Sequence, residues 1–182
     1  LAAGDFASAA DILQLAAPDI LREPAGLSRV ARWLAASPPE VRRSRPELNF
    51  WYAVALFFAP GARGAANPYE QVLAEAEAGW RERQDPAGEG SVLSLRAHVA
   101  WRRRDYVESC QLAEQALAQL PETAFFRRGL ALHALGAAQA ALGKADAAAK
   151  ALEAARAVAA EEGSKVSLWT VMDAYAGVLA MQ

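Results

Sequence analysis

The sequence has few of the residues that usually carry chemistry or cross-links. Its 182 residues include one cysteine, Cys110, and two histidines, His98 and His133. A single cysteine cannot build an intrachain disulfide framework, so we expect a reducing compartment, the cytoplasm. Neither histidine has a cysteine or a carboxylate four residues away, which excludes a paired zinc site on one helix. We therefore expect no metal site, no catalytic residue and no enzymatic activity.

Long apolar runs and an excess of basic charge are also missing. No run reaches the roughly 18 residues of a membrane span. The first ten residues, LAAGDFASAA, lack the basic start and apolar core of a signal peptide and begin without methionine. We expect a fragment of a longer protein, with no contact to a membrane. The net charge of −2, from 19 Lys+Arg and 21 Asp+Glu, does not favour a domain that holds nucleic acid through phosphates.

Alanine, by contrast, makes up about a quarter of the chain, and hydrophobic residues make up 54%. Alanine is the best helix former, β-branched residues are sparse, and no stretch alternates for long with a period of two, so the pattern predicts an all-α fold. Prolines and glycines divide the chain into about nine helical segments. We place these near residues 5–16, 26–36, 46–59, 67–84, 90–103, 105–119, 122–142, 144–162 and 164–181.

Two segments between these helices are rich in proline and glycine. RQDPAGEGS (83–91) is predicted to be a mobile loop, and FFAPGARGAANP (57–68) is the next candidate.

The clearest internal repeat is a helix–turn–helix unit of the tetratricopeptide kind. It lies in LALHALGAAQAALGKADAAAKALEAARA (130–157), and VLSLRAHVAWRRRDYVESCQLAEQALAQLP (92–121) is a weaker copy about 39 residues earlier. Small residues such as Gly136 and Ala148 stand where two helices would cross closely. The pattern predicts degenerate repeats stacked in a right-handed α-solenoid over residues 46–182, with residues 1–45 as N-terminal helices leading into it.

The repeat register also predicts a binding surface. In tetratricopeptide arrays, fixed positions of each first helix face a concave groove. Counting from residues 48, 90 and 129, we expect this groove to hold Tyr52, Ser94, His98, Trp101, Arg102 and His133. Mixed aromatic and polar surfaces of this kind suit sugars, peptides or carboxylates. The alternative is that the histidines and the tryptophan fill crevices between repeats.

The first 60 residues carry a more specific pattern. It begins with Gly4-Asp5 and an alanine-rich helix, and it continues with Leu27, Trp33-Leu34, Pro38, Val41, Pro46, Leu48 and Ala53. This pattern resembles the region after the ATPase module in MalT-type, LuxR-family transcriptional activators, although Ser37 stands where a leucine is commoner. The later residues resemble the degenerate repeats of that family.

The resemblance implies a role in signal reception. It implies that superhelical repeats bind a small-molecule effector or a regulatory protein and bias a switch between resting and self-associating forms. ATP would bind a missing N-terminal module, and DNA a missing C-terminal helix-turn-helix, so we expect no cofactor in this fragment. Arg42, Arg43 and Arg45 would lie in a turn before the first repeat helix, where they cap helix ends or pair with acidic neighbours.

Two alternatives stay open. The chain could be a tetratricopeptide-type adaptor for protein–protein interaction, with no transcriptional role. It could also be a purely structural arm, with recognition carried out elsewhere.

Overall fold

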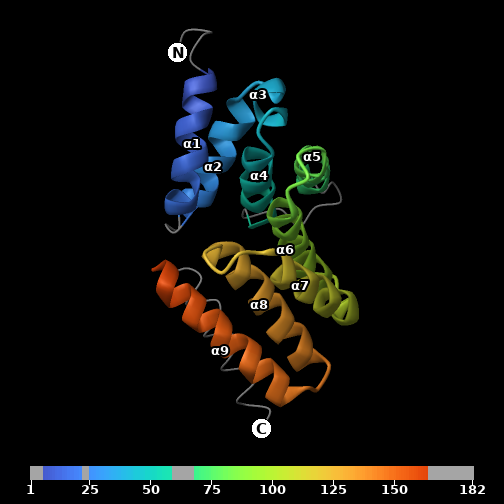
Figure 1. Cartoon of the computed structure of the whole chain (residues 1–182). Helices are drawn as coiled ribbons and strands as arrows, with labels where there is room; N and C mark the ends of the chain where they lie inside the picture. Colours follow the sequence, from blue (N-terminus) through green and yellow to red (C-terminus); the bar gives the residue numbers. More distant parts are fainter. Residues whose placement is uncertain (1–5, 22–24, 59–67, 164–182) are drawn as a thin grey trace. The chain divides into compact units, whose positions relative to one another are not determined.

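The computed structural model describes residues 6–21, 25–58 and 68–163, and these are helical without any strand (Figure 1). The all-α prediction is thereby confirmed. The helices are α1 (Phe6–Leu21), α2 (Gly26–Ala36), α3 (Pro39–Arg43), α4 (Pro46–Phe58), α5 (Pro68–Glu82), α6 (Pro86–Arg102), α7 (Tyr106–Gln119), α8 (Phe125–Ala141) and α9 (Ala145–Glu162). The helix expected over 164–181 lies outside the described residues. None of the described helices is both long and apolar enough to cross a membrane.

Three expectations about helix boundaries are wrong. Residues 83–91 are mostly helical, because α6 begins at Pro86. Helix α1 continues past Pro18 to Leu21 instead of ending near residue 16. The short helix α3 was not expected between α2 and α4. Of the second predicted loop, the ends at 57–58 and 68 are helical, and residues 59–67 lie outside the described ranges.

The chain forms two compact units, Leu1–Gly88 and Glu89–Gln182. From the sequence we expect a different division, into N-terminal helices up to residue 45 and repeats from residue 46. That division stays a prediction. In the first unit, α1 packs on α2, α2 on α4, and α4 on α5. The core of this unit includes Val30, Leu34 and Phe50, none of which exposes any surface. The Phe50 ring lies 5.9 Å from the Trp80 ring, and this contact ties α4 to α5.

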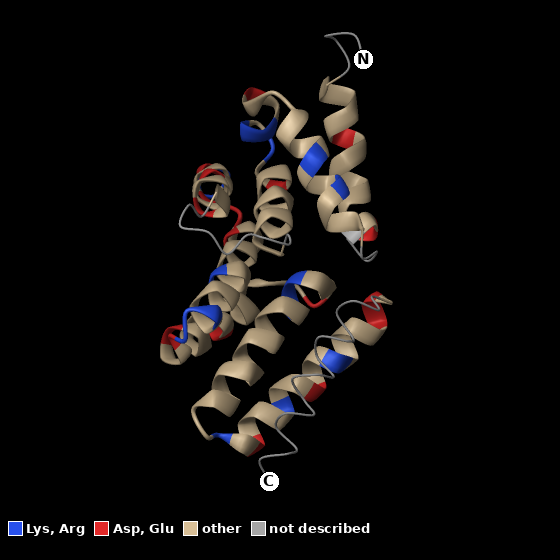
Figure 2. Ribbon diagram, turned by 180° about the vertical axis from the view of Figure 1, so that it is seen from behind, with Lys and Arg blue, Asp and Glu red and all other residues tan. Residues whose placement is uncertain are grey.

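Three arginines on and just after α3, Arg42, Arg43 and Arg45, bind other parts of the first unit; the basic segment at α3 is blue in Figure 2. The Nη1 atom of Arg42 donates hydrogen bonds to the carbonyl oxygens of Leu34 and Ser37, both at 2.6 Å. These carbonyls belong to the C-terminal end of α2, where the last carbonyl groups lack the usual intrahelical donors. Among the described residues, the Leu34 carbonyl otherwise accepts only from the Ser37 amide, at 3.3 Å. Arg45 forms an ion pair with Asp11 at 2.8 Å, and Arg43 forms one with Glu75 at 3.7 Å. The expectation that these arginines cap helix ends or pair with acidic neighbours is confirmed.

The second unit is built from two helical hairpins, α6–α7 and α8–α9. At the α8–α9 crossing, a Cβ atom added to Gly136 would lie 2.6 Å from Leu152 Cγ and 3.2 Å from the Ala148 carbonyl oxygen. At the α6–α7 crossing, the Ser109 hydroxyl donates a hydrogen bond to the Ala97 carbonyl at 2.9 Å. Close helix contact therefore depends on small side chains in both hairpins.

The two hairpins share the same turn. In each, a residue in the left-handed conformation follows the first helix: Arg104 (φ 65°) after α6 and Gly143 (φ 75°) after α8. The next amide then bonds back to a carbonyl five residues earlier, Asp105 to Ala100 and Lys144 to Gln139. This is the bonding of a Schellman-type helix end. The two turns are 39 residues apart, the spacing that the sequence repeat predicts.

Candidate functional site

Three of the six residues predicted to bind a ligand come together where α6 meets α8. The rings of His98 and His133 stack at 5.1 Å between centroids, with an interplanar angle of 22°. The Trp101 ring lies edge-on to both, at 5.2 Å from His98 and 5.5 Å from His133. We call these three side chains the histidine cluster. It joins the first helix of one hairpin to the first helix of the next.

Burial makes the two imidazoles poor bases. His98 is 4% exposed and His133 is 5% exposed. Desolvation lowers the pKa of His98 to about 3, helped by the neighbouring His133 and by Arg102, while a hydrogen bond with the Leu130 backbone opposes the shift. Desolvation also lowers the pKa of His133 to about 4. Both rings are therefore neutral near pH 7.

The other three predicted residues do not join the cluster in an open groove. Ser94 is fully buried, and its hydroxyl donates a hydrogen bond to the Ser91 carbonyl at 2.7 Å. Arg102 is exposed at the end of α6. Tyr52 belongs to the other unit, where the Arg42 guanidinium lies 5.1 Å from its ring centroid. Ligand binding by these residues stays a prediction, and the burial favours the alternative that the histidines fill a crevice between hairpins.

The buried ring of His133 keeps one unused hydrogen-bonding atom. Its Nδ1 atom is buried and makes no hydrogen bond within the described part of the chain. Such atoms are uncommon in folded proteins, because losing water without gaining a partner costs free energy. The cluster could thus accept or donate one hydrogen bond if a small molecule or a rearrangement reached it.

The described residues offer few other groups that could bind a metal or react. In residues 6–21, 25–58 and 68–163, no three His, Cys, Asp or Glu side chains lie close enough together to hold a metal ion. The half-buried thiol of Cys110 has its pKa raised, first by desolvation and then by Glu114. A thiol with a raised pKa holds less of the reactive thiolate near neutral pH.

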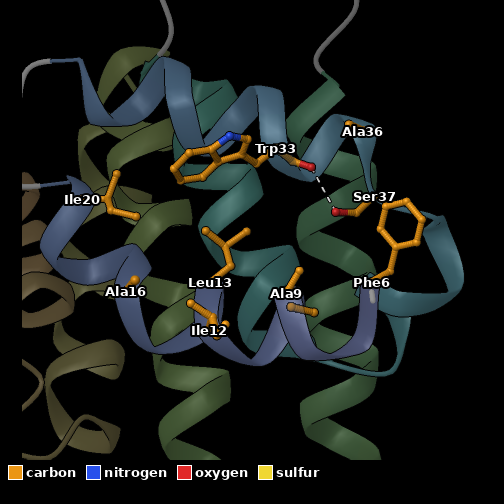
Figure 3. A pocket seen from close by; sticks show the side chains of 10 residues that line it. Phe6, Ala9, Ile12, Leu13, Ala16, Ile20, Trp33, Ala36 and Ser37 are labelled. Carbon is orange, nitrogen blue, oxygen red and sulfur yellow. Dashed lines mark hydrogen bonds between the residues drawn. The ribbon is translucent and has the colours of Figure 1, made fainter. Parts of the chain in front are cut away.

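The first unit holds an open groove that the sequence patterns did not predict. It has a volume of about 520 Å³ and lies between α1 and α2. In Figure 3, Leu13 and Ile20 of α1 point toward the Trp33 ring of α2, and Phe6 lies beside Ser37 at the other end. We call this the α1–α2 groove. Apolar side chains line nearly all of it.

One signal in the sequence could have indicated this groove. Helix α1 reads FASAADILQLAAPDIL, and its apolar residues cover more of the circumference than one buried face requires. Ile12 is 68% exposed and Leu15 is 81% exposed, and Trp33 on the facing helix is 43% exposed. An amphipathic surface helix would place charges at such positions.

Comparisons with known proteins found no match. No family model matches the chain, and neither the curated proteins nor the solved structures contain a match.

Proposed function

We propose that the chain is a non-enzymatic, effector-sensing region built from tetratricopeptide-like hairpins, of the kind found in MalT-type transcriptional regulators. The observation that carries the proposal is the histidine cluster at the joint of two hairpins. Under this proposal, these residues bind a small-molecule effector or a regulatory protein, and bind neither ATP nor DNA.

The position of the cluster supports a role in switching. Its three rings connect α6 to α8, so a ligand that contacts one ring also changes the free energy of the joint between the hairpins. Trp101 is half-buried at the edge of the cluster, and Arg102 is exposed in the next position. A ligand with a ring and an acidic or hydroxyl group would stack on the indole and bond to the guanidinium.

The repeat packing supports the tetratricopeptide-like assignment. The turns at Arg104 and Gly143 share their geometry and are 39 residues apart. Gly136 and Ala97 occupy matching places in α8 and α6 at the same spacing, and each lies at the crossing with its partner helix. Repeats of this kind stack in arrays, and such arrays commonly serve as binding scaffolds.

A thermal-shift screen tests the proposal with sugars, amino acids, nucleotides and phenolic metabolites. A ligand at about 100 times its dissociation constant stabilises the folded state by roughly 2.7 kcal/mol. In a domain of this size, that corresponds to about 5–10 °C. The shift should disappear in Trp101→Ala and persist in Trp33→Ala, which removes an indole from the other unit.

Two outcomes would count against the proposal. A ligand whose shift survives in a folded Trp101→Ala protein binds somewhere other than the histidine cluster. If no compound in the library shifts the unfolding temperature, a protein partner or a structural arm is favoured over a small-molecule sensor.

A further inference from the structure

The α1–α2 groove has properties of a ligand site that are independent of the histidine cluster. We propose that it binds a slender, uncharged hydrocarbon chain of a small molecule.

The Ser37 hydroxyl and the backbone carbonyls at the C-terminal end of α2 already have hydrogen-bonding partners. The Ser37 hydroxyl donates a hydrogen bond to the Trp33 carbonyl oxygen at 3.0 Å. The carbonyl oxygens of Leu34 and Ser37 accept hydrogen bonds from Arg42. Among the described residues, no charged side chain lines the groove. A charged ligand would lose water there without gaining an oppositely charged partner, so the electrostatic match is to an uncharged apolar group.

The shape favours a chain over a bulky ring system. The lining of α1 runs from Phe6 to Ile20, and these fourteen residue steps of helix span about 21 Å. A volume of about 520 Å³ over that length makes the groove narrow. It also lies within the range of roughly 300–1,000 Å³ that small-molecule sites occupy. Ala9 and Ala16 leave room along the helix where larger residues would fill it.

The walls of the groove leave apolar surface in water. Trp33 is 43% exposed and Ile12 is 68% exposed, and both line the groove. Covering such surface with a hydrocarbon chain removes apolar area from both partners, which is the main source of affinity for a ligand of this class.

The test measures, by isothermal titration calorimetry, how tightly the full chain binds a series of 1-alkanols. Each added methylene should tighten binding about fourfold while the groove accommodates it. Ala9→Trp places a ring in the groove and should weaken binding at least tenfold. The matched control is Leu15→Gln, which removes an exposed apolar side chain of α1 outside the lining and should leave binding unchanged.

The folded state of each variant is checked by circular dichroism, and Ala36→Trp blocks the groove from α2 if Ala9→Trp does not fold. The proposal is overturned if the blocked and control variants bind alkanols equally, since that indicates non-specific adsorption. It is also overturned if alkanols do not bind and the chain instead forms dimers, or sediments with phosphatidylcholine vesicles, in a way that Ala9→Trp abolishes. Those results would assign the groove to a second copy or to a membrane.

Discussion

The buried histidine pair shows how a residue that is common in active sites can also contribute to packing. His98 and His133 present flat, neutral rings to each other and to Trp101, and the contact fills the space between α6 and α8. Their burial lowers their pKa values to about 3 and about 4. The same rings are therefore a source of acid sensitivity, because the unfolded chain binds protons that the folded chain cannot.

This difference predicts a pH dependence of stability. In the unfolded chain, a histidine has a pKa near 6.5, above both folded values. The stabilisation is therefore present above pH 6.5 and is lost as the pH falls through 6.5 toward 4. When the pH falls from 7 to 5, each histidine should lower the free energy of unfolding by about 1–2 kcal/mol. Urea unfolding at the two pH values measures the loss.

The double variant His98→Gln/His133→Gln is the control for this prediction. It keeps side chains of moderate size but removes both titrating groups, so the pH-dependent loss should shrink by about 2–4 kcal/mol whatever the stability at pH 7. An unchanged loss in a folded double variant would show that other groups cause the acid sensitivity. A single His133→Gln variant should give an intermediate loss.

At the scale of the helix pair, changing either of two glycines of α8 to alanine should have opposite effects on stability. A Cβ atom at Gly136 would lie 2.6 Å from Leu152 Cγ, so Gly136→Ala should destabilise the fold by about 1–3 kcal/mol. At Gly129, the nearest atom to an added Cβ is Val158 Cγ1 at 3.6 Å, an ordinary contact. Gly129→Ala should therefore stabilise by about 0.5–1 kcal/mol, because alanine is the better helix former.

Both glycine variants are measured by urea unfolding at one pH. A stabilised Gly136→Ala protein would mean that the α8–α9 crossing is looser than the structure indicates. Equal effects at the two positions would contradict the close contact of α8 with α9 at Gly136.

Most helices could be predicted from the sequence, because their boundaries follow from local chemistry. Helix α2 occupies the expected residues, and α4, α7 and α9 end within a residue or two of the prediction. Prolines at the start of α3, α4, α5 and α6 fit the first turn of a helix, where the missing amide hydrogen costs little.

The segment at 83–91 was mispredicted because two of its glycines serve tertiary packing. A Cβ atom at Gly88 would lie 2.2 Å from the Trp80 ring, and one at Gly90 would lie 2.9 Å from Gln119 Cβ. Both glycines lie inside α6, where close approach of another helix requires them. Sequence alone cannot distinguish a glycine of this kind from one that ends a helix.

The candidate site was only partly accessible to sequence reasoning, for a related reason. The repeat register predicted that His98, Trp101 and His133 face one groove, and the structure does bring them into contact. Whether that face is open or covered depends on how closely the next hairpin packs. The α1–α2 groove depends likewise on the spacing of two helices, which no local pattern encodes.

For the whole molecule, the charges argue against direct DNA binding. The chain carries a net charge of −2, and Arg42, Arg43 and Arg45 already bind the end of α2, Glu75 and Asp11. Fluorescence anisotropy with a short labelled duplex at about 0.15 M salt should give a dissociation constant weaker than about 10⁻⁴ M. Tighter binding that is lost when Arg42, Arg43 and Arg45 are changed to alanine would contradict this prediction.

We propose that an effector acts through the joint between the two hairpins of the second unit. Amide hydrogen exchange is measured with and without the best ligand of the thermal-shift screen, because exchange reports local opening along each helix. We expect exchange to slow in α6 and α8, around His98 and His133, and Trp101→Ala to abolish the slowing. Unchanged exchange in α6 and α8, with slowing confined to α1 and α2, would overturn this proposal and move the sensing site to the α1–α2 groove.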